Sequence, residues 1–165
     1  NRNQFIKQLK KNILKMLENE NLEIKYDMSR MYIYVDENKL VVIRQYRVPI
    51  NGYVIELPAG LVDGNESFEE AVKRELKEET GLDLIDIDRA GTKEKIYVSV
   101  GMTDESIALV KCTCNGIVSN ENLEEDEDIE VVMLNKEEAK ELIASNENID
   151  VKAFLAIQNF ILSDD

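Results

Sequence analysis

The chain has 165 residues, of which 44% are hydrophobic, and it carries a formal net charge of −14 at pH 7. Its length and apolar content predict one globular domain with a hydrophobic core. Its acidity argues against a long nucleic acid as a partner, because binding to the phosphate backbone needs a basic surface. There is no histidine, which excludes histidine-based catalytic triads and the usual zinc sites. The sequence contains no apolar run that could span a membrane and no signal-peptide pattern, so we expect a cytoplasmic protein with no membrane partner.

The first predicted element is a helix over residues 4–20, which we interpret as an additional N-terminal helix that packs on the domain. Its apolar residues recur at helical spacing, with lysines on the other side; they are Phe5, Ile6, Leu9, Ile13, Leu14 and Leu17. A helix on a membrane surface is the weaker alternative, since one short basic face is common. With a short strand at 23–26, this helix makes residues 1–30 an N-terminal extension of a main domain at 31–165.

The rest of the chain contains predicted strands followed by two C-terminal helices. Apolar and β-branched runs between turn signals predict strands at 31–35, 40–45, 53–57, 93–100, 106–114 and 130–134. Asn135 and Asp150 are suitable N-caps for a helix over 136–144 and for a last helix that reaches about residue 162. No repeat or change in composition indicates a second domain. This order predicts an α/β (α+β) fold, an α/β/α sandwich around a mixed β-sheet.

The two cysteines, Cys112 and Cys114, lie two positions apart in a predicted strand. Both side chains therefore point to one face of the sheet, where a disulfide between them is sterically unfavourable. We interpret them as small core hydrophobes, and a redox or metal-binding pair is the alternative.

A helix with clustered glutamates is predicted between the strands at 53–57 and 93–100. Ser67 and Glu70 have the spacing of a capping box, and Gly81 can adopt the left-handed conformation that ends a helix. We therefore expect a helix over residues 68–80. On that helix three carboxylates share one face; they belong to Glu75, Glu78 and Glu79.

The helical wheel gives these carboxylates an unusual place. It puts Phe68, Val72 and Leu76 in one apolar sector and Glu70, Lys73, Arg74 and Lys77 on the opposite, solvated side. Glu75 and Glu79 fall inside or beside the apolar sector, where burial of a carboxylate is costly unless a cation compensates it. Oxygen-only ligands favour Mg²⁺ or Mn²⁺. The alternative is an ordinary amphipathic helix whose glutamates are solvated and whose Arg74 pairs with Glu78.

Residues 60–82, GLVDGNESFEEAVKRELKEETGL, match every fixed position of G-x5-E-x7-R-E-U-x-E-E-x-G-U, where U is aliphatic. The stretch resembles the Nudix box of hydrolases that split nucleoside diphosphates linked to another group. The resemblance implies a Nudix-type α/β/α sandwich and a Mg²⁺ cofactor, with Mn²⁺ as an alternative. It also implies metal ligands at the Ala59 carbonyl, Glu75 and Glu79, with Glu78 as a further ligand or a member of the same cluster. Arg74 is expected to orient these glutamates, and Glu66 to order the junction between loop and helix.

The resemblance extends beyond the box, over roughly residues 31–162. Two segments, Arg44-Gln45-Tyr46-Arg47 and Glu56-Leu57-Pro58-Ala59-Gly60, are similar to those of ADP-ribose pyrophosphatases and related nucleoside-diphosphate-sugar hydrolases. This similarity implies substrate-binding roles for Arg44, Arg47 and Glu56, with a phosphate or a terminal ribose as the group that Arg47 binds. A surface cation is the alternative interpretation of Arg47.

The base that takes a proton from the attacking water is expected in the acidic run 121–130. In the ADP-ribose subfamily a loop glutamate has this role, and matching its motif to this run nominates Glu125, with Glu124 and Glu127 as competitors. The alternative is a solvated acidic loop without a catalytic role.

Two departures from that subfamily affect the substrate and the oligomer. The usual Ser-Pro-Gly stretch beyond the box is replaced by Ser99-Val100-Gly101, which weakens the assignment to ADP-ribose itself. The β-rich N-terminal segment through which many such enzymes form exchanged dimers is shortened, which argues against a homodimer by that route. The leading hypothesis is a metal-dependent hydrolase of a nucleoside diphosphate sugar. The alternatives are a nucleoside triphosphate or dinucleotide pyrophosphatase, and a nucleotide-sensing domain, against which the complete set of glutamates argues.

Overall fold

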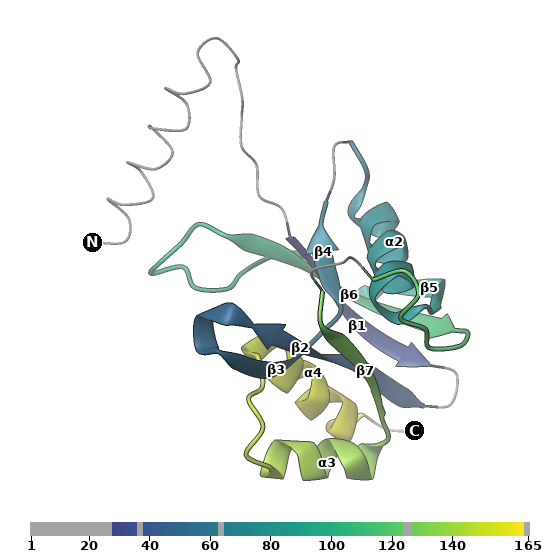
Figure 1. Cartoon of the computed structure of the whole chain (residues 1–165). Coiled ribbons are helices and arrows are strands. Elements are labelled where there is room, and N and C mark those ends of the chain that lie inside the picture. Colours follow the sequence, from purple (N-terminus) through teal and green to yellow (C-terminus); the bar gives the residue numbers. More distant parts are fainter. Residues whose placement is uncertain (1–27, 36–37, 63–64, 124–126, 164–165) are drawn as a thin grey trace.

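A computed structural model describes residues 28–35, 38–62, 65–123 and 127–163 (Figure 1). The predicted helix at 4–20, the strand at 23–26 and the N-terminal extension that they form lie outside the described residues. Within the described part of the chain, no helix is both long and apolar enough to cross a membrane.

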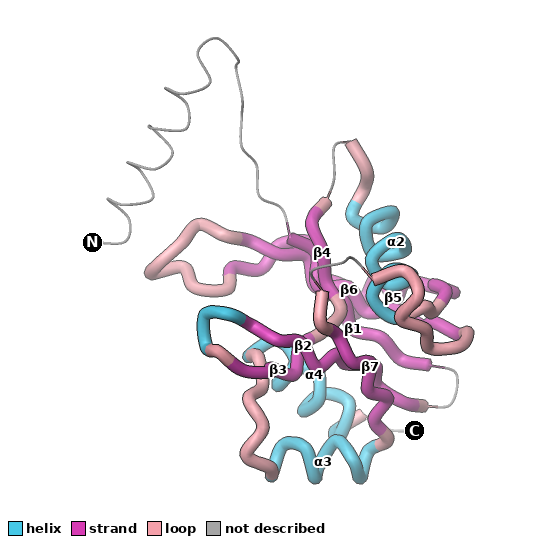
Figure 2. Tube along the Cα trace, viewed as in Figure 1, coloured by secondary structure: helices cyan, strands magenta, loops and turns pink. Residues whose placement is uncertain are grey.

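The described residues form a seven-stranded mixed sheet. Strand order is β3-β2-β1-β6-β5, while β4 pairs with β1 and β7 pairs with β2 (Figure 2). The pairing of β1 with β6 is parallel and the other pairings are antiparallel. The bounds are β1 Met28–Val35, β2 Lys39–Arg47, β3 Gly52–Glu56, β4 Ala59–Leu61, β5 Asp83–Tyr97, β6 Ser106–Asn115 and β7 Ile129–Leu134. The mixed sheet predicted from the sequence is confirmed.

Helices cover both faces of this sheet. Alternation along β2 sends Val41 into a core beneath α2 (Phe68–Thr80), with the apolar residues of β6. Leu40 and Val42 enter a second core on the opposite face, beneath α3 (Lys136–Ala144) and α4 (Val151–Leu162). Figure 1 shows α2 on one side of the strands and α3 and α4 on the other. The predicted α/β/α sandwich is therefore confirmed.

The bounds of the three helices agree with the capping signals in the sequence. Ser67 and Glu70 form the predicted capping box of α2, and Gly81 ends that helix with φ 76°. Asn135 and Asp150 accept backbone hydrogen bonds at the starts of α3 and α4. These local bonds satisfy backbone groups that would otherwise lack partners, which is why short polar residues define the helix ends so well.

Two strands differ from the predictions. Strand β5 begins at Asp83, ten residues before the predicted strand at 93–100, and its pairing with β6 shifts register at three places. Each irregularity interrupts the period-two alternation by which a strand is recognised, so the first part of β5 gave no strand signal. Strand β4, Ala59–Leu61, lies between the predicted strand at 53–57 and the predicted helix at 68–80, where no strand was predicted, and it is formed by its pairing with β1.

The two cysteines give a prediction about accessibility. Cys112 and Cys114 are free thiols buried in the core beneath α2, and burial raises the pKa of the Cys112 thiol to about 12. At pH 8 the reactive thiolate of Cys112 is then a fraction on the order of 10⁻⁴. We expect neither thiol to react with an aromatic disulfide reagent in the native protein and both to react in denaturant. Rapid labelling of the native protein would contradict this placement.

Candidate functional site

The buried carboxylate of Glu79 lies against the start of β4. Glu79 is the most buried glutamate of α2, at 3% relative exposure. Its Oε2 accepts a hydrogen bond from the Ala59 amide at 2.8 Å. A buried carboxylate is tolerated only when its oxygens have donors. This bond brings together two of the residues predicted to hold metal.

Arg74 bridges three further glutamates. Its Nη1 donates to Glu75 Oε1 at 2.7 Å and to Glu78 Oε2 at 3.0 Å, while its Nη2 donates to Glu66 Oε1 at 2.7 Å and to the Leu61 carbonyl at 2.9 Å. The hydrogen bond that Arg74 donates to Glu66 is the largest of the causes that raise the pKa of Arg74. We refer to Glu66, Glu75, Glu78 and Glu79 as the glutamate cluster.

The wheel's placement of Arg74 on the solvated side of the helix is confirmed only in part, and the pairing of Arg74 with Glu78 that the alternative expected is present. The Arg74 side chain is 31% exposed and lies among the carboxylates. A long arginine can lay its stem along the helix and carry its guanidinium to a neighbouring sector, which a wheel of Cα directions does not represent. Lys73 and Lys77 are exposed, as the wheel predicts.

The Glu75 carboxylate occupies the space that a side chain at position 60 would need. A Cβ added to Gly60 would lie 1.6 Å from Glu75 Oε1 and 1.7 Å from its Cδ, so only glycine permits this approach. Burial raises the pKa of Glu75, Arg74 opposes that shift, and the charges of Glu78 and Glu127 add to it. The first two residues of β4 thus contact two carboxylates of the cluster.

A second ion pair lies on the same face of the sheet. Arg47 Nε and Nη2 donate to the two carboxylate oxygens of Glu56 at 2.6 and 3.0 Å. Glu56 is buried at 6% exposure, and a bidentate pair fixes the orientation of the guanidinium. The hydrogen bond to Glu56 is the main cause that raises the pKa of Arg47, and the charge of Glu79 contributes. The structure therefore brings Arg47 and Glu56 towards the glutamate cluster.

Arg44 is not brought to this group. It lies three residues before Arg47 on β2, so the two side chains leave opposite faces of the sheet. The guanidinium of Arg44 lies 4.0 Å from the centre of the Tyr53 ring and 3.7 Å from Glu130. Arg44 therefore lies on the face of the sheet away from α2. Its role in substrate binding remains a prediction.

The acidic run before β7 is described in part. Glu124 and Glu125, including the nominated base, lie outside the described residues. Glu127 is described and half-buried, and its charge acts on Glu75. Its neighbour Asp128 accepts a hydrogen bond from the Tyr53 hydroxyl at 2.6 Å. Sequence patterns missed that contact, because it joins residues 75 positions apart.

The donors of the cluster suit the predicted metal. They are all oxygens, which Mg²⁺ and Mn²⁺ prefer, and Gly60 leaves Glu75 a place against the backbone beside Ala59. The guanidinium of Arg74 lies between the carboxylates of Glu66, Glu75 and Glu78. Within the described ranges, no three acidic, histidine or cysteine side chains are grouped as a metal site would require. The chemistry of the donors fits the ion, and the ligand roles remain predictions.

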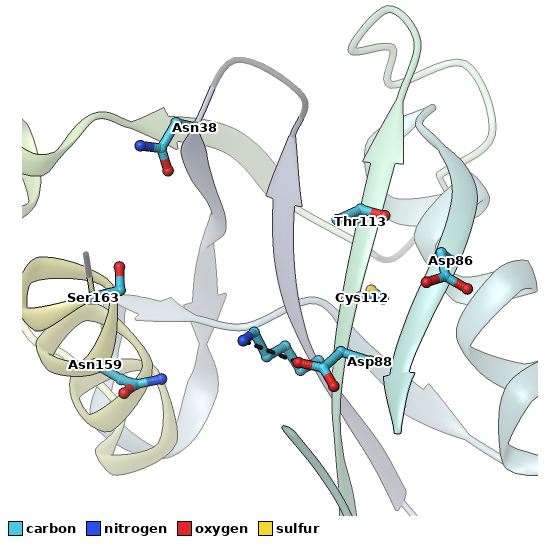
Figure 3. Close-up of a pocket in the computed structure, with 8 residues that line it drawn as sticks. Asn38, Asp86, Asp88, Cys112, Thr113, Asn159 and Ser163 are labelled. Atoms are coloured by element: carbon cyan, nitrogen blue, oxygen red, sulfur yellow. Dashed lines mark ion pairs between the residues drawn. The ribbon is translucent and has the colours of Figure 1, made fainter. Parts of the chain in front are cut away.

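Of two hollows in the described surface, only one includes a residue of the glutamate cluster in its lining. One, of about 670 Å³, lies along α2 and is lined by Glu70, Lys73, Arg74, Lys77, Glu78 and Asn122. The other, of about 450 Å³, lies between β5, β6 and α4 (Figure 3). It contains the ion pair of Lys111 with Asp88 at 3.0 Å and none of the predicted site residues. The hollow along α2 is therefore the one associated with the glutamate cluster.

Comparison with protein families identifies the domain. A model of the NUDIX domain matches residues 28–154. The chain belongs to the Nudix family. The match runs from the first residue of β1 into α4, so this Nudix domain includes the whole described sheet and the glutamate cluster. A second model, of the ThiI ferredoxin-like domain, matches residues 1–48, which overlap the Nudix match at 28–48.

Proteins of similar sequence support the family assignment, but their names indicate different activities. The ADP-ribose pyrophosphatase of Bacillus subtilis (strain 168) is 32% identical over 124 residues, which are 74% of this chain and 65% of that relative. The methanol dehydrogenase activator of Bacillus methanolicus is 32% identical over 126 residues, with the same two shares. The Nudix chain thus spans about 65% of the length of each. The crystal structure of an ADP compounds hydrolase aligns with a TM-score of 0.67 at 22% identity, over 82% of this chain and 70% of that one, which supports the fold alone.

Proposed function

We propose that this Nudix protein is a divalent-metal-dependent pyrophosphatase that cleaves a nucleoside diphosphate linked to another group. A nucleotide sugar is the preferred substrate class, and ADP-ribose is the first to test because it is named in the B. subtilis relative. The observation that carries the proposal is the glutamate cluster around Arg74 and Gly60. It concentrates carboxylates in a partly buried place beside β4, where a dication would compensate them.

The proposed roles follow from the contacts of each residue. Glu75, Glu79 and the Ala59 carbonyl hold Mg²⁺, with Glu78 assisting. When bound, Mg²⁺ neutralises the diphosphate and lowers the pKa of a bound water. Arg74 orients Glu66, Glu75 and Glu78 by hydrogen bonds and does not itself contact the substrate. Arg47 offers the substrate phosphate a guanidinium that Glu56 already orients, which limits the conformational freedom lost on binding.

Glu127 and Glu125 compete for the role of proton acceptor. The charge of Glu127 acts on Glu75, which is the reason to test Glu127 first, whereas the motif match nominates Glu125. A general base typically contributes 10²–10⁴-fold to the rate. We expect Glu127→Gln to lower kcat by about 10²-fold and Glu125→Gln to change it by less than about threefold. The opposite ranking would return the role to Glu125.

A panel of substrates tests the proposed function. The purified protein is incubated with ADP-ribose, other nucleotide sugars, dinucleotides and nucleoside triphosphates, with Mg²⁺ or with a chelator, and released nucleotides are separated by chromatography. We expect Mg²⁺-dependent release of a nucleoside monophosphate from at least one nucleotide sugar. Preferential hydrolysis of nucleoside triphosphates or dinucleotides would assign the other pyrophosphatase class. Tight binding without turnover would favour a nucleotide sensor, an alternative for which the activator among the relatives gives a reason.

A further inference from the structure

The Tyr53 hydroxyl connects β3 to the segment that carries Glu127. Strands β3 and β7 both pair with β2, and Tyr46 of β2 lies opposite Tyr53 in the register. On its other edge, the Tyr46 amide donates to the Asp128 carbonyl at 3.2 Å, which continues the β7 ladder by one residue. Tyr53 and Asp128 are thus two strand spacings apart, roughly 10 Å. The tyrosine and aspartate side chains together span that distance, and the Tyr53 hydroxyl donates to Asp128 Oδ2 at 2.6 Å.

The ring of Tyr53 is itself held in place. The Arg44 guanidinium lies 4.0 Å from the ring centre, and the Tyr46 ring meets it edge-on with centroids 5.6 Å apart. Cation–π and edge-to-face contacts both restrict how the ring turns. The hydrogen bond to Asp128 is the largest cause that raises the pKa of the Tyr53 hydroxyl, so the hydroxyl remains a proton donor at neutral pH. The bond therefore joins Asp128 to an ordered group.

The side chains of the neighbouring residues Glu127 and Asp128 point to different faces of the sheet. The Asp128 carbonyl accepts from the Tyr46 amide, and the Asp128 carboxylate accepts from the Tyr53 hydroxyl, on the face of Arg44. The bond between the Tyr46 amide and the Asp128 carbonyl extends the β7 ladder to Asp128, and continuing its alternation by one residue puts Glu127 on the face of α2. The effect of its charge on Glu75 agrees with that direction. Fixing Asp128 on one face therefore fixes where Glu127 lies on the other.

We propose that Tyr53 is a positioning residue whose hydroxyl holds Asp128 and thereby keeps Glu127 beside the glutamate cluster. The effect on turnover rests on the proposed function, whereas the effect on the Glu127–Ile129 backbone does not. Tyr53 lies on the face of the sheet away from α2 and does not contact the reacting atoms. Its contribution is to restrict the positions that the Glu127 carboxylate samples.

Tyr53→Phe and Tyr46→Phe make a matched pair for the test. Each removes one hydroxyl from the same ring pair, but the Tyr46 hydroxyl donates to Asn51 at 2.6 Å, whereas the Tyr53 hydroxyl donates to Asp128. We expect faster deuterium uptake in peptides that contain Glu127–Ile129 for Tyr53→Phe and unchanged uptake for Tyr46→Phe. We also expect Tyr53→Phe to lower kcat by about 3- to 10-fold, as one hydrogen bond allows, with KM unchanged within about twofold.

Substitutions at Asp128 separate positioning from a general loss of structure. Asp128→Asn keeps an oxygen that accepts from Tyr53 and should retain the wild-type uptake and kcat. Asp128→Ala should match Tyr53→Phe, and the double variant should be no worse than either single one, because both remove the same bond. Unchanged uptake in Tyr53→Phe, equal effects of the two phenylalanine variants, or faster uptake without a fall in kcat would each overturn the proposal. If the wild type hydrolyses nothing, the proposed function fails, and the uptake comparison alone supports or overturns the role of Tyr53.

Discussion

Replacing Glu79 by glutamine is expected to lower kcat/KM by at least about 10²-fold, because it removes one anionic metal ligand from the cluster. The substitution is nearly isosteric. Its amide oxygen can still accept from the Ala59 amide, the bond that Glu79 makes at 2.8 Å, so we expect the fold to persist. Kinetic measurements on the best substrate of the panel give the effect on turnover. The rise in Tm on adding Mg²⁺ should also be smaller in the variant, because the free energy by which a ligand stabilises the folded state grows with the logarithm of the ligand concentration divided by Kd.

Glu69→Gln is the matched control for that change. Glu69 lies on the same helix, but it pairs with Arg89 at the surface and is not one of the four glutamates of the cluster. It should keep both the wild-type turnover and the wild-type response of Tm to Mg²⁺. Turnover by Glu79→Gln equal to that of the control would remove Glu79 from the metal site.

Gly60→Ala is expected to reduce activity by on the order of 10²-fold, with much less effect on stability. The added Cβ would meet Glu75 Oε1 at 1.6 Å, so the carboxylate must leave its place and its bond with Arg74. A displacement of about 1 Å at a catalytic group can cost 10²-fold in rate. The obstructing atoms are the far end of a flexible side chain, which can turn away, so we expect the free energy of unfolding to fall by less than about 2 kcal/mol.

Gly101→Ala provides the control for this second substitution. A Cβ at Gly101 meets nothing within 4 Å, so the same chemical change should leave kcat/KM unchanged. Kinetics and denaturant unfolding of the three proteins are measured together. If Gly60→Ala loses activity only as far as it loses folded protein, or keeps wild-type activity, then the approach of Glu75 to position 60 is not needed for catalysis.

Local signals explain what the sequence could predict. Capping bonds act within a few residues, so Ser67, Glu70 and Gly81 sufficed to define α2, and the spacing within the box placed its three glutamates on one helix. The position of Arg74 depends on how a long side chain bends between carboxylates from the loop and the helix. That arrangement depends on tertiary contacts, which a helical wheel does not represent. The irregular first part of β5 was not predicted for a related reason. Its pairing with β6 makes it a strand, whereas its own sequence lacks regular alternation.

Long-range pairing decided the rest of the site. Arg44 and Arg47 belong to one short motif, yet strand alternation separates them, and only Arg47 reaches the buried Glu56. The contact of Tyr53 with Asp128 depends on both edges of β2 being paired. The sequence supplied the residue types, and the sheet determines which of them meet.

Phosphorus NMR of ADP-ribose with the wild-type protein tests the central claim most directly, namely that the glutamate cluster supports metal-dependent cleavage of a diphosphate. The two diphosphate resonances should be replaced by phosphomonoester resonances when Mg²⁺ is present and should persist with a chelator. Glu79→Gln should slow the conversion by at least about 10²-fold. If the diphosphate stays intact with Mg²⁺, and the same holds for the other nucleotide sugars of the panel, the proposed activity is contradicted. Cleavage that proceeds equally with the chelator would instead contradict the role given to the metal.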